Sequence, residues 1–349
     1  MESAPPLRAL SCPDKFRGTL TAPEAAAAIA RGLRAASIAE ARELPLADGG
    51  EGTLDALLAA LGGERRSAVV TGPAGEPVRA DWGLLPSGTA VVEMAQASGL
   101  ALVGAANDPR TATTRGTGEL IALAARAGAV EILVGVGGSA TVDGGLGAVE
   151  ALGWSLDGVA VTVVCDVTTA FLDAARVYGP QKGAGPEDVG FLSGRLERQA
   201  ELYRERSGVD VRLLPGAGAA GGLAGGLATI GAVLRPGFEV VAEAVGFREA
   251  LADSDLAVTG EGRLDRTSLA GKVVGGVLAA AAAAGVRSAV IAGQVADDLD
   301  PAALTGSPDV LSLVELAPSP DEAERRAGEL LEEAARAAGL RARRRADGA

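Results

Sequence analysis

The sequence predicts an α/β protein: a domain with an open, largely parallel sheet, interrupted by an inserted domain of mixed α/β structure. Short apolar runs alternate with alanine-rich helical stretches along the chain, which is typical of βαβ units. The length of 349 residues suits two domains, since one domain takes about 100–200 residues. In the middle of the chain, short apolar runs instead follow one another over tight turns. We therefore predict a discontinuous first domain over residues 1–66 and 254–349, and an inserted domain over residues 67–253.

The first domain is predicted to hold a five-stranded sheet. Residues 7–12 are an apolar run, and the helix after them opens with Thr21 and Glu24 at the spacing of a capping box and ends near Ala36. The other predicted strands are residues 42–46, 256–259, 288–292 and 310–314, and the other predicted helices are residues 51–61, residues 271–284 and a stretch near Pro301. The arginine-rich end of the chain, residues 341–349, is predicted to be disordered.

The inserted domain is predicted to begin with an antiparallel meander. Its strands are the apolar runs at residues 69–71, 78–85 and 90–94, which are joined by short polar turns. Helix and strand pairs follow, with strands around residues 132–136 and 161–166. The inserted domain is thus expected to combine an antiparallel part with a parallel part.

Composition excludes several classes of partner. A net charge of −13 argues against binding to nucleic acid or to an anionic membrane. The longest apolar stretch, residues 273–286, is shorter than the ~18 residues that a membrane span needs. Two cysteines, Cys12 and Cys165, cannot form a disulfide framework and suit a reduced, cytoplasmic protein. The expected partners are small molecules, and assembly into a homo-oligomer stays open.

The chain contains no histidine. This excludes a Ser-His-Asp or Cys-His nucleophile, histidine acid/base chemistry and histidine-ligated metal sites. Carboxylates, hydroxyls, lysines and arginines remain. They suit a reaction in which positioning and charge neutralisation carry most of the catalysis, and phosphoryl transfer with Mg²⁺ is the leading member of that class.

Lysine is rare in this sequence. Of the 32 basic residues only Lys15, Lys182 and Lys272 are lysines, and all three stand in glycine-flanked segments. A lysine supplies a compact charge with three donors, and glycine-rich segments let backbone N–H groups approach an anion closely. Either these lysines serve an anion site, or glycine is simply abundant, at 50 residues.

Three polar, glycine-rich motifs are predicted at the ends of strands in the first domain. They are PDKFRGT at residues 13–19, ADGGEGT at residues 47–53 and TGEGRLD at residues 259–265. In open α/β sheets ligands bind beyond the carboxyl ends of the strands, so we expect the motifs to lie together. The candidate site residues are Lys15, Arg17, Asp48, Gly49, Gly50, Glu51, Gly260, Glu261, Arg263 and Asp265. The alternatives are a plain turn at Asp48, a structural ion-pair cluster around Arg263 and a surface pair or helix cap at Arg17.

The inserted domain carries a second set of candidates in GVGGSATVDGG, residues 135–145. Gly138, Ser139, Thr141 and Asp143 there combine backbone N–H groups, two hydroxyls and a carboxylate, which suits a phosphate or carboxylate nest. The alternative is a tight turn between strand and helix. Residues 113–119, TTRGTGE, repeat the idea more weakly, and Lys182 follows in GPQKGAG.

GAGAAGG at residues 216–222 satisfies the spacing G-x-G-x-x-G of a dinucleotide-binding loop. The preceding run is brief and ends at Pro215, and chance matches are expected in so glycine-rich a chain. We interpret these glycines as packing residues. A dinucleotide-dependent oxidoreductase is therefore the weaker alternative function.

Eight motifs in order resemble the signature segments of the type I glycerate kinase family: PDKFRGTLTA, PLADGGEGT, VTGPAGEPV, VVEMAQASGL, GVGGSATVDGG, GPQKGA, GAGAAGG and TGEGRLD. The resemblance implies phosphorylation of D-glycerate by ATP at the 2-hydroxyl, giving 2-phosphoglycerate in glycerate and glyoxylate metabolism. It also implies a flavodoxin-like domain with an inserted domain that resembles restriction endonucleases.

The chain departs from the family pattern at three places. Arg17 stands where the family has lysine, and Val142 where it has asparagine. The segment between residues 151–153 and 165–167 is shorter than in the family. If the shorter segment abolishes chemistry, the chain is a non-catalytic homologue that binds ligands.

The hypothesis gives each candidate a role. Lys15, Arg17 and Lys182 neutralise phosphate and carboxylate groups, and Ser139 and Thr141 cradle phosphate oxygens. Mg²⁺ is held by Glu51, Asp143, Glu261 or Asp48.

One of these carboxylates, or Asp265, orients the attacking hydroxyl and accepts its proton, and Arg263 stabilises the transferring group. Which carboxylate does which is left open.

Overall fold

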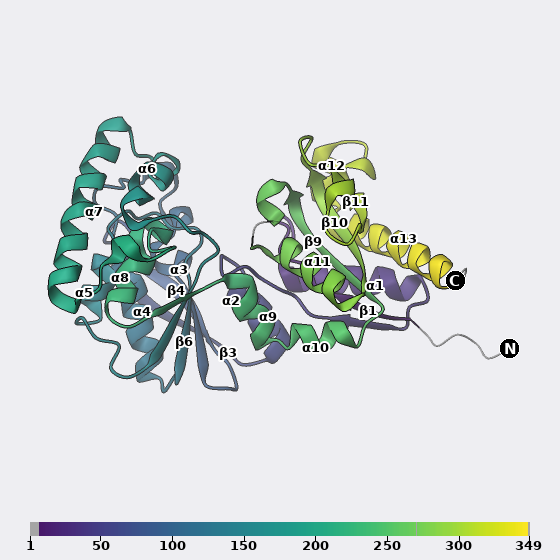
Figure 1. Ribbon diagram of the computed structural model, residues 1–349, viewed down its shortest axis with the longest axis horizontal. Coiled ribbons are helices and arrows are strands. Elements are labelled where there is room, and N and C mark those ends of the chain that lie inside the picture. The colour runs from purple at the N-terminus through teal and green to yellow at the C-terminus, as the bar shows by residue number, and fades with distance from the viewer. Residues whose placement is uncertain (1–6, 270, 348–349) are drawn as a thin grey trace. The chain divides into compact units, whose positions relative to one another are not determined.

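The chain divides into two compact units in the computed structural model, which describes residues 7–269 and 271–347 (Figure 1). Unit 1 takes the described residues of Met1–Asp48, Asp55–Ala60 and Phe238–Ala349, and unit 2 takes Gly49–Leu54 and Leu61–Gly237. Unit 2 ends before the border predicted at residue 253. The reason is that Phe238 and Phe247 pack edge-to-face at 5.7 Å within unit 1.

Unit 1 holds a five-stranded sheet in which every neighbouring pair is parallel. Its strands are β1 (Arg8–Ser11), β2 (Glu40–Glu43), β9 (Leu256–Leu264), β10 (Arg287–Val295) and β11 (Asp309–Ser312). Their order in the sheet is β11-β10-β9-β1-β2. Counted along the chain this is the order 2-1-3-4-5 of flavodoxin-like sheets, which reverses direction between β1 and β9. The predicted open parallel sheet of five strands is confirmed.

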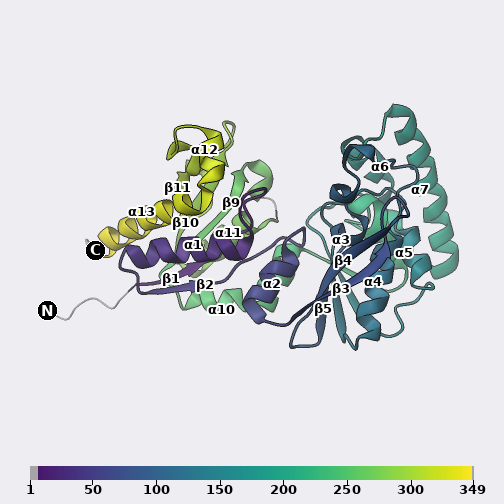
Figure 2. The same cartoon turned by 180° about the vertical axis from the view of Figure 1, so that it is seen from behind.

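The helices of unit 1 follow the expected rhythm. Helix α1 (Ala22–Ala35) begins with the predicted capping box, in which Thr21 and Glu24 each bond the other's backbone N–H. It packs on α13 (Ala327–Asp347), as Figures 1 and 2 show. The contact needs Gly32, because a Cβ there would lie 2.1 Å from the carbonyl oxygen of Glu332. The other helices are α2 (Thr53–Leu61), whose residues fall in both units, α9 (Gly237–Ala244), α10 (Phe247–Ala252), α11 (Val273–Ala284) and α12 (Pro320–Arg325).

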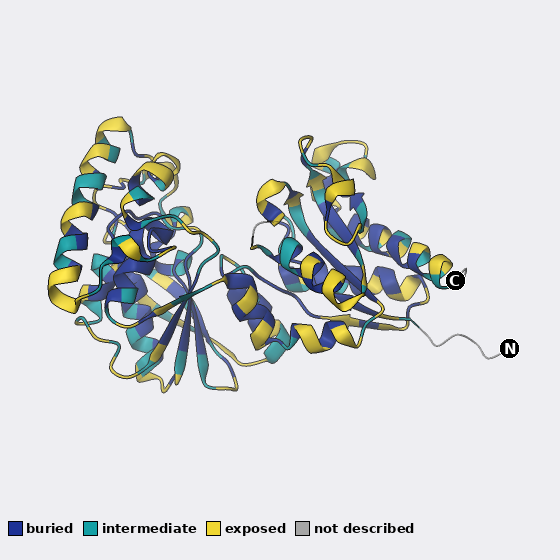
Figure 3. Cartoon of the chain, viewed as in Figure 1, coloured by how far each residue is buried: buried dark blue, intermediate teal, exposed yellow. Residues whose placement is uncertain are grey.

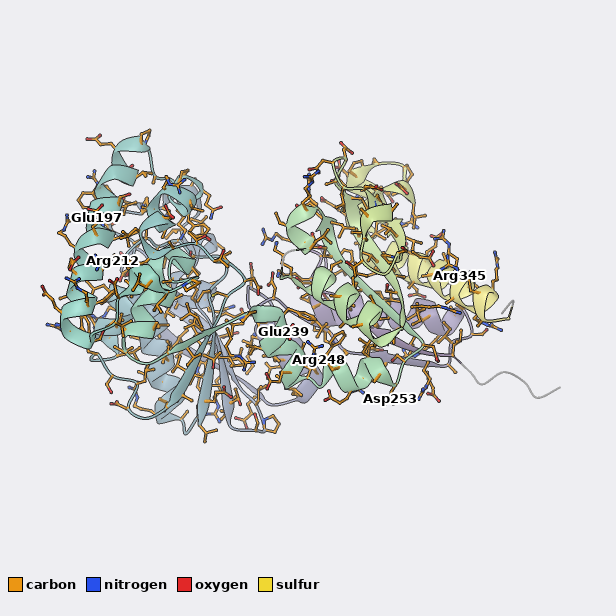
Figure 4. The ribbon with its side chains drawn as sticks, in the orientation of Figure 1. Glu197, Arg212, Glu239, Arg248, Asp253 and Arg345 are labelled. Carbon is orange, nitrogen blue, oxygen red and sulfur yellow. The ribbon has the colours of Figure 1, made fainter. Side chains whose placement is uncertain are left out.

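Three predictions for unit 1 are wrong. The motif at residues 259–265 is not a loop, because β9 continues through Leu264 and pairs with an equally long β10, Arg263 opposite Gln294. Residues 341–347 continue helix α13 rather than being disordered, since Ala342 is buried and Arg345 lies 2.9 Å from Asp309 (Figure 4). Residues 348 and 349 lie outside the described chain. The helix expected near Pro301 is one 3-10 turn, Pro301–Ala303.

Unit 2 holds a six-stranded mixed sheet in the order β3-β4-β5-β6-β7-β8. The strands are β3 (Glu64–Thr71), β4 (Pro77–Leu84), β5 (Thr89–Glu93), β6 (Glu131–Gly135), β7 (Ala160–Val164) and β8 (Val233–Arg235). The first three pair antiparallel and the rest parallel, which confirms the predicted meander and the parallel part after it. The helices are α3 (Ala95–Ser98), α4 (Arg115–Arg126), α5 (Leu146–Ala151), α6 (Ala174–Tyr178), α7 (Pro186–Ser207) and α8 (Leu223–Thr229).

Each unit has its own apolar core, and the central strands of both sheets are largely buried (Figure 3). A third cluster in unit 2 packs α6 and α7 around Phe171, Leu196 and Val142. Val142 is therefore buried in an apolar cluster, which suits valine better than the asparagine that the family resemblance implies. Among the helices of the described residues, none combines the length and the hydropathy that a membrane span requires.

Candidate active site

In unit 1, three acidic residues belong to neighbouring strands at the place where the order of the strands reverses. Asp14 follows β1, and its backbone N–H donates to the carbonyl oxygen of Gly260 in β9 at 2.9 Å. Asp48 follows β2, and Glu261 lies in β9 beside Ala292 of β10. The motifs after β1 and β2 and the one within β9 therefore occupy the position at which open α/β sheets bind ligands.

Asp14 is the functional candidate that the sequence analysis missed. Its side chain is buried, and Oδ1 accepts the backbone N–H of Lys15 at 2.7 Å and lies 3.6 Å from the ammonium of Lys15. Burial raises the pKa of Asp14 to about 6, with the negative charge of Asp48 adding to the rise and Lys15 opposing it. The sequence shows only that Asp14 directly precedes a lysine in the first motif, and Asp265 likewise precedes a basic residue.

Glu261 has a similar environment. Burial raises the pKa of Glu261 to about 7, and the negative charge of Asp14 adds to the rise. A hydrogen bond with Ser268 and the positive charge of Lys272 oppose the rise. Its Oε1 is buried without a hydrogen-bond partner among the described residues. Lys272 lies at the start of helix α11, and its charge acts on Glu261. Each of the three lysines therefore lies beside a candidate site residue.

The other candidates of unit 1 are less enclosed. Lys15 is half-buried, whereas Arg17 and Arg263 are exposed. Gly260 is buried in β9, where a Cβ would lie 2.1 Å from the carbonyl oxygen of Ile291, so its role is close packing of two strands. Asp265 caps a 3-10 turn, since its Oδ1 accepts the backbone N–H and the hydroxyl of Thr267, each at 2.7 Å.

These bonds to Thr267 lower the pKa of Asp265 and engage its Oδ1. The arrangement favours a structural role over that of a proton acceptor.

In unit 2, the central feature is the buried ammonium of Lys182. Its Nζ donates to Ser139 Oγ at 2.6 Å and to the carbonyl oxygen of Thr141 at 2.7 Å. Asn107 braces the same place, because its Nδ2 donates to the carbonyl oxygens of Ala140 and Lys182. Burial lowers the pKa of Lys182 to about 7, and the charge of Asp143 opposes the shift. The structure thus brings Lys182 together with two residues of the predicted nest, Ser139 and Thr141, through a hydroxyl and a carbonyl oxygen.

Asp143 organises this loop. Its Oδ2 accepts the backbone N–H and the hydroxyl of Thr114, each at 2.8 Å, and the N–H of Gly147 at 3.4 Å. Its Oδ1 accepts the N–H of Gly145 at 3.1 Å. A carboxylate that holds four donors is a loop anchor first, and metal ligation by Asp143 would require it to release some of them.

The remaining glycine candidates permit close packing. Gly49 has φ +83°, and a Cβ there would lie 2.4 Å from Val164. Gly50 packs against Gly137, because a Cβ on Gly137 would lie 2.7 Å from the Cα of Gly50. The exposed Gly138 has φ +73°, which favours glycine. Glu51 is exposed.

The glycines of residues 216–222 are packing residues, as interpreted from the sequence. They follow a 3-10 turn, Val211–Leu213, rather than a strand, so the strand-turn-helix context of a dinucleotide loop is missing. A Cβ on Gly221 would lie 2.0 Å from the carbonyl oxygen of Thr141, and one on Gly218 would lie 2.4 Å from that of Ala170. The segment therefore packs closely against the backbone at Thr141.

Replacing Gly221 by alanine is expected to lower the free energy of unfolding by about 3 kcal/mol, since it adds overpacking to a left-handed backbone. Gly221 has φ +68°, and the new methyl group would collide with the main chain at Thr141. Chemical denaturation measures the change. The matched control is Gly190→Ala in α7, where a Cβ meets open space and should stabilise slightly. Equal stability of the two variants would contradict the packing role.

Mg²⁺ fits unit 1 in one respect. Within residues 7–269 and 271–347, no three acidic or cysteine side chains lie close enough to form a complete protein cage for a metal. Mg²⁺ seldom needs one, because it is often held by one or two carboxylates together with waters and substrate phosphates. The orphaned, buried Oε1 of Glu261 suits such a single-carboxylate ligand. The exposed Glu51 and the fully engaged Asp143 suit it less.

Known proteins match this chain over nearly its whole length. The model of the glycerate kinase family matches residues 9–158 and 155–342. The glycerate 2-kinase of Escherichia coli K12 is 41% identical over 84% of this chain and 87% of its own. The glycerate kinase of Bacillus subtilis 168 is 40% identical over 95% of this chain and 96% of its own. A crystal structure from Salmonella typhimurium LT2, assigned as a glycerate kinase 2, superimposes with a TM-score of 0.85 at 36% identity, covering 98% of this chain and all of that one.

The comparisons also bear on the shortened segment. The family match breaks at residues 155–158, between the two motifs that flank the segment. The alignment with the Bacillus protein spans 367 positions while covering 95% of this chain's 349 residues, which leaves roughly 35 positions without a counterpart here. In the structure α5 and β7 are joined by tight turns with positive φ at Trp154 and Asp157. Despite this shortening, the chain belongs to the glycerate kinase family, a family of phosphotransferases.

Proposed function

We propose that this protein transfers the terminal phosphoryl group of ATP to the 2-hydroxyl of D-glycerate, with Mg²⁺, and produces 2-phosphoglycerate in glycerate and glyoxylate metabolism. The observation that carries the proposal is the buried ammonium of Lys182 on Ser139 and Thr141, within a family motif. A buried cation held against hydroxyl and backbone groups is suited to an anionic ligand, because low solvent exposure strengthens charge-assisted hydrogen bonds.

In this proposal the basic groups bind and orient the anionic parts of the substrates. Lys182 with Ser139 and Thr141 serves oxygens of a phosphate or carboxylate, and Lys15 and Arg17 serve the others. Exposed Arg263 reaches the transferring group. All of this is charge neutralisation and positioning, which is what phosphoryl transfer demands of a protein.

The acidic groups divide into two kinds. Asp143 and Asp265 hold the backbone of their own loops, so we propose that they position other groups. Asp14, Asp48 and Glu261 lie where their charges act on one another, and one of them orients the attacking hydroxyl and accepts its proton. Glu261 would hold Mg²⁺, which when bound neutralises charge on the phosphate oxygens.

The test is an assay for ADP formation with D-glycerate, ATP and Mg²⁺, followed by ³¹P NMR of the product. A phosphate on C2 couples to one proton and gives a doublet, whereas a phosphate on C3 couples to two and gives a triplet. ADP release with a doublet supports the proposal in full. A triplet would move the phosphoryl group to the 3-hydroxyl, and stabilisation by the ligands without ADP would identify a non-catalytic binding protein.

Replacing Asp48 by asparagine is expected to lower kcat by about 10²-fold or more, because it removes one of the charges that act on the reacting groups. The kcat and the melting temperature are measured together. Asp253→Asn is the matched control, since Asp253 is an exposed acid of the same unit (Figure 4). Turnover near the wild-type level in Asp48→Asn would remove Asp48 from the site.

A further inference from the structure

Two arginines of unit 2 lie over one exposed aromatic ring, and a third follows nearby on the same helix. Phe191 and Arg195 lie one helical turn apart in α7, and Arg198 follows on the same side of the helix. The guanidinium of Arg110, from the loop before α4, lies 4.3 Å from the ring centroid of Phe191, and that of Arg195 lies 5.2 Å from it. The guanidinium of Arg195 also donates to the carbonyl oxygen of Arg110. Phe191 therefore holds two guanidinium groups in place by cation–π contacts.

Arg195 lacks the close carboxylate partner that neighbouring arginines of this unit have. Arg212 is 2.7 Å from Asp210 and 2.6 Å from Glu201, and Arg204 is 2.8 Å from Glu201 (Figure 4 labels Arg212). In contrast, no carboxylate of the described residues lies within 4 Å of the half-buried Arg195 guanidinium.

Burial is the largest influence on Arg195 and lowers its pKa. The negative charges of Asp143 and Asp108 oppose this shift, whereas the like charges of Arg198 and Arg110 add to it. Arg110 itself is only loosely paired, at 3.5 Å from Asp188. Like charges held together in a protein of net charge −13 indicate a place for an anion.

The cluster of Arg110, Arg195 and Arg198 is continuous with the nest around Lys182. The loop that carries Arg110 is fixed at one side by Asn107, which bonds Ala140 and Lys182, and at the other by Thr114, which bonds Asp143. The negative charge of Asp143 also acts on Arg195 and opposes the lowering of its pKa by burial. An anion that reaches from Lys182 along this loop would meet the arginines next.

We propose that Arg195 and Arg110 bind the phosphate chain of the nucleotide, and that Phe191 is the positioning residue that holds their two guanidinium groups side by side for it. This rests on the proposed kinase function. A triphosphate is favoured over the carboxylate of glycerate because the guanidinium groups of Arg110 and Arg195, together with the ammonium of Lys182, supply more charge than a single carboxylate can balance. Planar guanidinium forks suit phosphate oxygens in particular.

The first experiment separates the two substrates. Arg195→Ala should raise the KM for ATP by about 10-fold or more, as expected for the loss of a charge-assisted bidentate contact. The KM for D-glycerate should stay within about twofold, and kcat should change little. Arg195→Lys keeps the charge but loses the planar guanidinium group, so its KM for ATP should lie between those of the wild type and Arg195→Ala. Phe191→Ala should raise the KM for ATP through loss of positioning.

Arg204→Ala is the matched control, because Arg204 is a carboxylate-paired arginine of the same helix. It should leave both KM values unchanged.

An unchanged KM for ATP in Arg195→Ala would overturn the proposal, and a rise confined to the KM for D-glycerate would overturn the choice of ligand. A second measurement does not depend on turnover. Inorganic tripolyphosphate should raise the melting temperature of the wild-type protein and of Arg204→Ala, but not that of Arg195→Ala. If the wild type shows this stabilisation yet makes no ADP from D-glycerate, the kinase proposal fails while the phosphate site stands.

Discussion

Replacing Lys182 by methionine should lower kcat by about 10²–10³-fold, the usual loss when one preorganised donor to a charged group is removed. Lys182 is buried, and its ammonium joins Ser139 Oγ to the carbonyl oxygen of Thr141. Methionine has a similar length and fills the space without the charge. Because a buried ammonium costs desolvation energy, the melting temperature should stay within a few degrees of the wild type or rise. Steady-state kinetics and thermal unfolding measure the two effects.

A loss of stability as large as the loss of activity would instead make Lys182 a structural residue. Ser139→Ala provides the matched comparison, since it removes one of the two partners of the ammonium and keeps the other. Its kcat should lie between that of the wild type and that of Lys182→Met.

The same lysine predicts opposite effects of pH on stability and on activity. Its pKa is lowered to about 7 in the folded protein, chiefly by burial, while the unfolded chain keeps the ordinary value of 10.5. Between these two values the unfolded state binds more protons, so the contribution of Lys182 makes stability rise with pH across this window. Below pH 7 both states are protonated, and the contribution no longer changes. Activity that requires the ammonium should instead fall as pH rises through about 7.

Rate profiles and denaturation between pH 6 and about 9.5 separate the two trends. In Lys182→Met both trends should disappear. Their persistence in that variant would assign them to groups other than Lys182. Glu261 would not account for the rise in stability, because its pKa is raised to about 7 and its contribution to stability falls as pH rises toward that value.

Replacing Asp143 by asparagine should lower the free energy of unfolding by about 3–5 kcal/mol, the range seen when one partner of a buried charged interaction is removed. Asp143 accepts two bonds from Thr114 and one each from Gly145 and Gly147, and an amide would turn its NH₂ group toward N–H donors. The loop of Ser139 and Thr141 should lose its shape, so kcat should fall as well. Denaturation and steady-state kinetics measure both quantities. Asp157→Asn, at an exposed aspartate of the same unit, is the control.

A variant Asp143→Asn with wild-type stability and no turnover would contradict the anchoring role. It would instead indicate that Asp143 contacts the reacting groups or Mg²⁺ directly, as the sequence predicted.

Local rules were enough to predict much of the fold. The capping box of Thr21 and Glu24 begins α1 where expected, and the apolar runs located the strands of both sheets except β8. The errors lie where distant segments decide. Residues 259–265 look like a loop by their glycines, but β10 extends alongside them and turns them into strand. The arginine-rich end becomes helix because Ala342 is buried in unit 1 and Arg345 reaches Asp309.

The candidate site shows the same division. The composition alone excluded histidine chemistry and pointed to the lysines, and the structure places Lys182 in the centre of a nest. No pattern in the sequence distinguished Asp14, which is buried beside Lys15, from Asp265, which caps a turn. Each aspartate is directly followed by a basic residue in the sequence. Only their surroundings in the folded protein differ.

The sequence by itself determined the order of the elements, the family motifs and the kinds of side chain available for chemistry, because these depend on residue type and on neighbours within a few positions. Only the tertiary structure decided which polar atoms are already occupied. Asp143 is engaged by Thr114 from 29 positions away, and Lys182 meets Ser139 from 43 positions away. A carboxylate is free for a ligand, or committed to its own fold, according to donors that the chain brings to it only when it folds.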